Sequence, residues 1–119
     1  MKKFLYLKLA RTDQLTKLYN RMALDDTLEN LSNTYTGTIR LGCIVCDLNN
    51  LKVTNDTYGH AVGDALLIGV AACLRDAYAN RGSIYRTGGD EFYVLFIDTD
   101  VDMQTMLRKM DNEIGRAHV

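Results

Sequence analysis

Two short apolar segments, Ser83–Thr87 and Glu91–Ile97, flank Gly88-Gly89-Asp90 and constrain the fold more than any other feature. The segments have the length and apolar character of β-strands. Glycine supplies the positive φ that tight hairpin turns need. The sequence therefore predicts an antiparallel hairpin whose turn is Gly88-Gly89-Asp90.

The remaining segments predict helices and one more strand around this hairpin. Leucines recur at helical spacing after a good N-cap residue, Asn20. A continuous apolar run further on is typical of a strand that is buried on both faces. The expected segments are a helix over Arg21–Ser32, a polar turn over Asn33–Thr38, a strand over Ile39–Leu48, a loop with at most short helical turns over Asn49–His60, a helix over Ala61–Ala79 and a helix that begins at Asp98. This order predicts an α/β (α+β) domain with helices packed on a small, mainly antiparallel sheet.

Length and charge restrict the possible partners. The chain has 119 residues, enough for one compact domain, with 14 basic and 15 acidic residues and a net charge of −1. No attraction to nucleic acid or to an anionic membrane is expected. Lys8 and Arg11 interrupt the apolar residues near the start, so we predict a helical lead-in over residues 1–12 rather than a signal or membrane segment. The expected location is cytoplasmic, although a longer parent protein could be membrane-anchored.

Cys43 and Cys46 form a C-x-x-C pair inside the predicted strand. Residues three apart on a strand point to opposite faces, so the two thiols cannot hold one metal together. We interpret both as small apolar core residues rather than as a zinc or redox site.

Carboxylates occur where the first strand ends and where the hairpin turns. Asp47 ends the strand, and Asp90 and Glu91 lie at the turn. If these strands are antiparallel neighbours, the carboxylates converge on one edge and offer the oxygen ligands that hard cations prefer. Mg²⁺ or Mn²⁺ ions at such an edge bridge triphosphate oxygens and activate an attacking hydroxyl. Taken alone, the same residues are also typical of ordinary turns.

Polar residues between the strand and the next helix suit a guanine nucleotide. The Asp64 carboxylate can accept both N–H donors on the Watson–Crick edge of guanine, and the Asn55 amide can also donate to O6. Lys52 can place positive charge near a phosphate. The structural alternatives are a turn and helix cap for Asn55, a favourable acid near a helix N-terminus for Asp64 and a hydrogen-bonded structural role for His60.

The order and spacing of these residues resemble one known family. Gly88-Gly89-Asp90-Glu91-Phe92 is the motif that names GGDEF domains, the diguanylate cyclases. Asp13–Arg21 is similar to the family's D-x-L-T-G-L-x-N-R opening, and Asp47–Asp64 is similar to its D-x-D-x-F-K-x-x-N-D-x-x-G-H-x-x-G-D block. Agreement runs from about Leu9 to Phe96.

The resemblance implies a palm-like nucleotide cyclase fold and a role for each matching residue. Asp47, the Leu48 carbonyl, Asp90 and Glu91 would hold a pair of Mg²⁺ or Mn²⁺ ions, and Asp90 would also assist deprotonation of the attacking hydroxyl. Asn55 and Asp64 would bind guanine. Lys52 would stabilise phosphate charge, and His60 would support the nucleotide pocket. The Gly88-Gly89 backbone would lie under the triphosphate, where side chains would obstruct it.

The implied activity is condensation of two GTP into cyclic di-GMP and two pyrophosphates by a homodimer, with an upstream sensor domain in the parent protein. The alternative is a catalytically inactive, GTP-binding regulatory domain. Both involve bacterial second-messenger signalling.

Departures from the family pattern are few. Lys17 replaces the usual Gly, Leu51 an often-present Phe, and Asn49 the second acid of D-x-D. We expect residues 13–113 to form an incomplete domain that lacks its C-terminal part, residues 114–119 to be a non-native tail, and this piece alone to be inactive.

Overall fold

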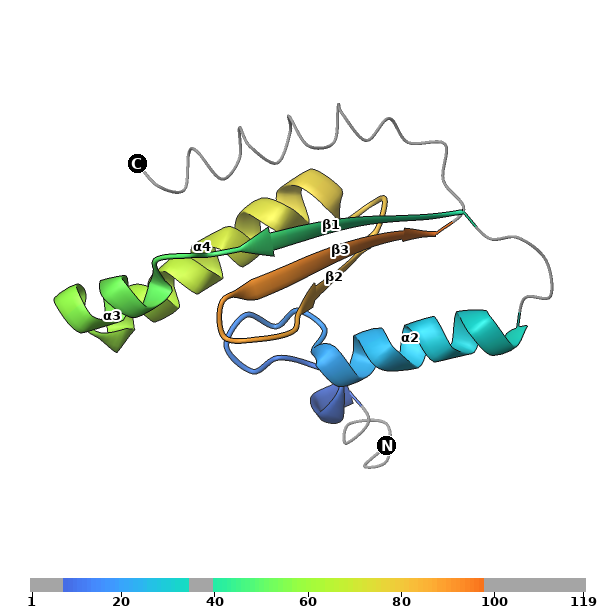
Figure 1. Cartoon of the computed structure of the whole chain (residues 1–119), viewed down its shortest axis with the longest axis horizontal. Helices are drawn as coiled ribbons and strands as arrows, with labels where there is room; N and C mark the ends of the chain where they lie inside the picture. Colours follow the sequence, from blue (N-terminus) through green and yellow to red (C-terminus); the bar gives the residue numbers. More distant parts are fainter. Residues whose placement is uncertain (1–7, 35–39, 98–119) are drawn as a thin grey trace.

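The computed structural model describes residues 8–34 and 40–97 (Figure 1). A helical turn at residues 8–10 precedes the first labelled helix. The elements are α2 (Arg21–Thr34), β1 (Leu41–Asp47), α3 (Leu51–Tyr58), α4 (His60–Tyr78), β2 (Ser83–Arg86) and β3 (Glu91–Ile97). Some predictions fall outside the described residues: residues 1–7 of the expected lead-in, residues 35–38 of the expected polar turn, residue 39 of the expected strand, the helix expected from Asp98 and the tail at 114–119.

The three strands form one antiparallel sheet in the order β1-β3-β2. β2 and β3 are the predicted hairpin, with Tyr85 opposite Tyr93, and β1 pairs with the other side of β3. Helices cover this sheet, as Figure 1 shows, and the predicted α+β class with a small antiparallel sheet is confirmed.

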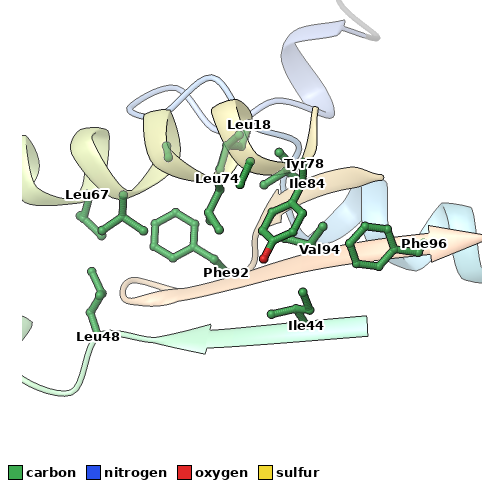
Figure 2. Packing of buried hydrophobic residues seen from close by; sticks show 13 residues of the cluster. Leu18, Ile44, Leu48, Leu67, Leu74, Tyr78, Ile84, Phe92, Val94 and Phe96 are labelled. Carbon is green, nitrogen blue, oxygen red and sulfur yellow. The ribbon is translucent and has the colours of Figure 1, made fainter. Parts of the chain in front are cut away.

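The main core lies between α4 and one face of the sheet (Figure 2). Phe92 and Phe96 of β3 point toward α4 and are fully buried. Tyr78, the last residue of α4, meets Phe96 edge to face with ring centroids 5.7 Å apart. Burial of each large apolar side chain stabilises the fold by about 1.5–3 kcal/mol, so this cluster fixes where β3 and its turn lie.

α2 covers the opposite face over β2 and β3. Its residues Ala23 and Leu24 pack with Tyr85 and Leu95 in a second, smaller cluster. The predicted N-cap is confirmed, because the Ala23 amide donates to Asn20 Oδ1 at 3.0 Å. The helix continues to Thr34, so the polar turn does not begin at Asn33 as predicted.

The prediction that the first strand is buried on both faces is wrong. β1 lies at one edge of the described sheet, and the second cluster covers β2 and β3 but not β1. Leu41 and Val45 are consequently half exposed, at 50% and 53%. Cys43 is also exposed, which corrects its assignment to the core, whereas Cys46 is half-buried against the main cluster.

The predicted loop over Asn49–His60 is also wrong, because α3 forms two helical turns there. The sequence of α3 has no apolar period that would indicate a helix, and none of its residues is fully buried in the structure. Gly59, with φ 92° and ψ 162°, separates α3 from α4. This backbone region is essentially restricted to glycine. No helix within the described ranges is long and apolar enough to cross a membrane.

Candidate functional site

The carboxylates of the predicted metal site lie at adjacent strand ends. Asp47 is directly opposite Glu91 in the register of β1 and β3. The Leu48 amide donates to the Asp90 carbonyl at 2.9 Å, which holds the end of β1 against the hairpin turn. The structure thus brings Asp47, Asp90 and Glu91 to one edge of the sheet, as the sequence predicted.

The donors at this edge suit a hard cation in kind. They are three carboxylates and the Leu48 carbonyl, all oxygen ligands of the type that Mg²⁺ and Mn²⁺ take. Asp47 is exposed, and Glu91 Oε1 accepts a hydrogen bond from Thr87 Oγ1 at 3.0 Å. The side chains of residues 8–34 and 40–97 form no cluster of three or more His, Cys, Asp or Glu placed to hold an ion. A shared cation therefore stays a prediction.

The hairpin turn corrects the reason given for its glycines. Gly88 and Gly89 are exposed, and neither has a positive φ. A Cβ at Gly88 would make only an ordinary 3.7 Å contact with Glu91 Cβ, and one at Gly89 would meet nothing within 4 Å. The fold of this chain does not require glycine at either position.

The residues predicted to bind guanine lie on the α3–α4 pair. Asn55 is inside α3, which excludes the turn-and-cap alternative, and its Oδ1 is buried without a hydrogen-bond partner. A Cβ built on Gly63 of α4 would lie 1.7 Å from that oxygen, so the Asn55 side chain lies directly against the bare helix at Gly63. Asp64 follows and is exposed.

Lys52 and His60 mark the starts of the two helices, and both are exposed. A hollow of about 410 Å³ lies where β1 ends and α3 begins. The residues that line it include Asp47, Leu48, Asn49 and Leu51.

The site residues thus fall into two groups, one at the sheet edge and one on the α3–α4 pair. No hydrogen bond or ion pair between side chains of the described residues joins the groups. The chain itself links them, from β1 through residues 48–50 into α3, and the 410 Å³ hollow lies along this link.

Sequence reasoning assigned no role to Asp13 and Arg86, which meet beside the turn. Arg86 Nη1 donates to both carboxylate oxygens of Asp13 at 3.2 Å, and Nη2 donates to the Gly89 carbonyl at 2.8 Å. Burial raises the pKa of Asp13, but hydrogen bonds from Thr16 and Arg86 and the Arg86 charge outweigh it and lower the pKa below its usual value. The available signal was a pair of opposite charges without an assigned role, one in the Asp13–Arg21 motif and one two residues before Gly88.

Comparison with known proteins gives one consistent family. Residues 10–118 match the family described as diguanylate cyclase, GGDEF domain. The bifunctional diguanylate cyclase/cyclic di-GMP phosphodiesterase MucR of Pseudomonas aeruginosa is 39% identical over 114 residues, which are 94% of this chain and 17% of MucR. The cyclic di-GMP phosphodiesterase PdeR of Escherichia coli is 37% identical over 106 residues, 89% of this chain and 15% of PdeR.

A solved structure agrees with these relatives. The crystal structure of the GGDEF domain of DgcB from Caulobacter crescentus, in complex with c-di-GMP, superposes with a TM-score of 0.79 at 32% identity. The match covers 90% of this chain and 64% of the DgcB chain. This chain spans less than a fifth of the length of the two curated relatives.

Proposed function

The chain belongs to the GGDEF domain family, a family of cyclic di-GMP signalling, and we propose that the protein containing it condenses two GTP into cyclic di-GMP. Each reaction would release two pyrophosphates. The two groups of site residues support this proposal in different ways. The group at the hairpin edge would bind the phosphates, and the group on the α3–α4 pair would bind the base.

The observation that carries the proposal is the pair of glycines that the fold does not need. Neither Gly88 nor Gly89 has a positive φ, and a Cβ would make an ordinary contact at Gly88 and none at Gly89. The backbone of this turn is therefore bare and exposed, so a group that approaches from outside can lie against it. The turn lies next to Asp90 and Glu91, so a triphosphate with its cations fits that position.

Asp47, Asp90, Glu91 and the Leu48 carbonyl would hold Mg²⁺ or Mn²⁺, which supplies charge neutralisation for the triphosphate. Asp90 would accept the proton of the attacking 3′-hydroxyl. Lys52, exposed on the first turn of α3, would place its ammonium near the phosphate oxygens.

Guanine would be read by the α3–α4 pair. The buried Asn55 Oδ1 lies against Gly63 of α4, and the amide NH₂ of Asn55 would donate to guanine O6. The Asp64 carboxylate is exposed close by and can accept from two adjacent N–H groups. His60 would support the pocket from the start of α4.

The reaction also requires two copies of the domain. One site of this kind holds one GTP, whereas the product joins two nucleotides through two phosphodiester bonds. Each 3′-hydroxyl must attack the α-phosphate of the other GTP, so two domains would face each other with two-fold symmetry. Control by an upstream sensor domain would then act through the geometry of this pairing.

A second function is GTP binding without turnover. Asn49 stands where the family usually has its second acid, which removes one negative charge from the metal edge. PdeR, which is 37% identical to this chain, is named only as a cyclic di-GMP phosphodiesterase. A segment similar to this chain therefore occurs in a protein that is not named as a cyclase.

The test uses the full-length protein with Mg²⁺ and labelled GTP. We expect cyclic di-GMP to form, Asp90→Asn to abolish it, and Asp64→Ala to weaken GTP binding by about 1–3 kcal/mol while ATP binding stays unchanged. Asp56→Ala is the matched control, because Asp56 is an exposed acid of α3 with no assigned role. GTP binding without product would favour the regulatory alternative, and absence of both would contradict both functions.

A further inference from the structure

The turn that would face the triphosphate is weakly held by its own residues. Gly88 and Gly89 are exposed, and two consecutive glycines give the backbone unusual freedom. The backbone bond from the Thr87 amide to the Glu91 carbonyl, 3.0 Å, closes the hairpin below the turn without involving either glycine. Something else must fix the position of the Gly88-Gly89 peptide.

Arg86 supplies that contact. Its guanidinium donates two sets of hydrogen bonds: Nη1 to the Asp13 carboxylate at 3.2 Å and Nη2 to the Gly89 carbonyl at 2.8 Å. The two side chains are only 15% and 21% exposed, so solvent screens this ion pair less than a surface pair. The planar fork of arginine makes both contacts at fixed angles, which a lysine ammonium cannot do.

Asp13 is itself held in place by the N-terminal turn. Its Oδ2 accepts hydrogen bonds from the Thr16 amide at 2.9 Å and from Thr16 Oγ1 at 2.7 Å. The same turn joins β2 through the backbone, because the Arg86 amide donates to the Tyr19 carbonyl at 2.8 Å. A rigid chain of bonds therefore runs from Asp13 through Arg86 to Gly89.

We infer that Arg86 is a positioning residue that holds the Gly88-Gly89 turn in place, and that Asp13 acts through it. The buried Nε of Arg86 has no hydrogen-bond partner, which costs the folded state free energy that a lysine would not lose. Stability alone thus gives no reason to prefer arginine here, whereas the hydrogen bond to Gly89 does. The kinetic part of this inference rests on the proposed cyclase function.

The experiment compares Arg86→Lys and Asp13→Asn with the wild-type full-length protein. Arg86→Lys keeps the charge opposite Asp13 but loses the hydrogen bond to Gly89. Arg21→Lys is the control. Arg21 and Arg86 both line a hollow beside the Gly88-Gly89 turn, but Arg21 pairs with Asp25 at 3.3 Å. Selective ¹⁵N-glycine labelling gives backbone order parameters for Gly88 and Gly89, with Gly63 and Gly69 of α4 as internal references.

For Arg86→Lys we expect order parameters at Gly88 and Gly89 to fall from about 0.85 toward 0.6 or lower, with the α4 glycines and the melting temperature unchanged. kcat should drop by roughly 10-fold or more, and KM for GTP should change little, because the base contacts lie on α3 and α4. Asp13→Asn should give a smaller change in the same direction.

Unchanged order parameters at Gly88 and Gly89 in Arg86→Lys would overturn the inference. Equal losses at the α4 glycines would overturn it too, since Arg86 would then be a general structural residue. A wild-type protein that makes no cyclic di-GMP, with a turn that still loosens in Arg86→Lys, would support the positioning and refute only the cyclase function.

Discussion

Each of the two groups of site residues contains a pair of glycines, and the fold requires glycine in only one of the two pairs. On the α3–α4 pair, Gly59 has a backbone conformation essentially restricted to glycine, and Gly63 leaves room for the Asn55 side chain. At the hairpin turn, neither Gly88 nor Gly89 has a positive φ, and an added Cβ would meet no obstacle at either position. The fold thus explains the first pair but not the second, for which the proposed function supplies a reason. Substitutions that separate stability from activity test this contrast.

The largest expected effect is on activity at the turn. Gly89→Ala adds a methyl group where nothing in the described chain lies within 4 Å, so the free energy of unfolding should change by no more than about 0.5 kcal/mol. If a triphosphate lies over this backbone, turnover should fall on the order of 100-fold. Thermal unfolding and initial rates on the same preparation measure both. Full activity in a stable Gly89→Ala protein would remove the argument for a ligand at this turn.

The sequence predicted most of the fold, but it did not predict the contrast between the glycines of the α3–α4 pair and those of the hairpin turn. The hairpin over β2 and β3, the N-cap Asn20 and the long helix α4 follow from local patterns of turn residues and apolar spacing. α3 was not predicted because its sequence has no apolar period. The helix packs against α4, where Asn55 lies against Gly63. Contacts between segments of this kind leave no trace in local spacing.

The candidate site was predictable to a similar extent. Strand pairing brought Asp47 opposite Glu91 because the end of β1 and the start of β3 lie at the same edge of an antiparallel pair. The expected positive φ at Gly88-Gly89 was wrong, because hairpin statistics do not specify a particular turn. Arg86 was missed because its partners, Asp13 and Gly89, lie on two different turns, which only the folded chain brings together.

The second prediction concerns the helical pair. Gly63→Ala would place a Cβ 1.7 Å from Asn55 Oδ1, so the amide must move or the helices must separate. We expect a loss of stability of about 1–3 kcal/mol and a loss of GTP affinity of similar size. Urea unfolding and calorimetric titration with GTP measure the two losses.

Gly69→Ala is the matched control, because Gly69 lies in the same helix with nothing within 4 Å of an added Cβ. It should stabilise the protein by about 0.5–1 kcal/mol through helix propensity and leave GTP binding unchanged. The double variant Asn55→Ala/Gly63→Ala should regain stability but not GTP binding. If it regains neither, the Asn55–Gly63 contact is not the reason for the glycine.

The smallest expected effect is at Lys17, where the backbone favours a glycine that the sequence lacks. Lys17 is the one described residue other than glycine with a positive φ, 65°, and its side chain is exposed. Its amide donates to the Asp13 carbonyl at 2.8 Å, so the turn that carries Asp13 depends on this conformation. A left-handed conformation costs a residue with a Cβ about 1–2 kcal/mol. Glycine does not have this cost, but its larger conformational entropy in the unfolded chain offsets part of the gain. Lys17→Gly should therefore raise the free energy of unfolding by about 0.5–1 kcal/mol, as measured by urea denaturation.

Lys17→Ala is the control, since it removes the exposed side chain but keeps the Cβ, and it should give no gain. Equal stabilisation by both substitutions would show that the lysine side chain, and not the backbone angle, is what destabilises this turn.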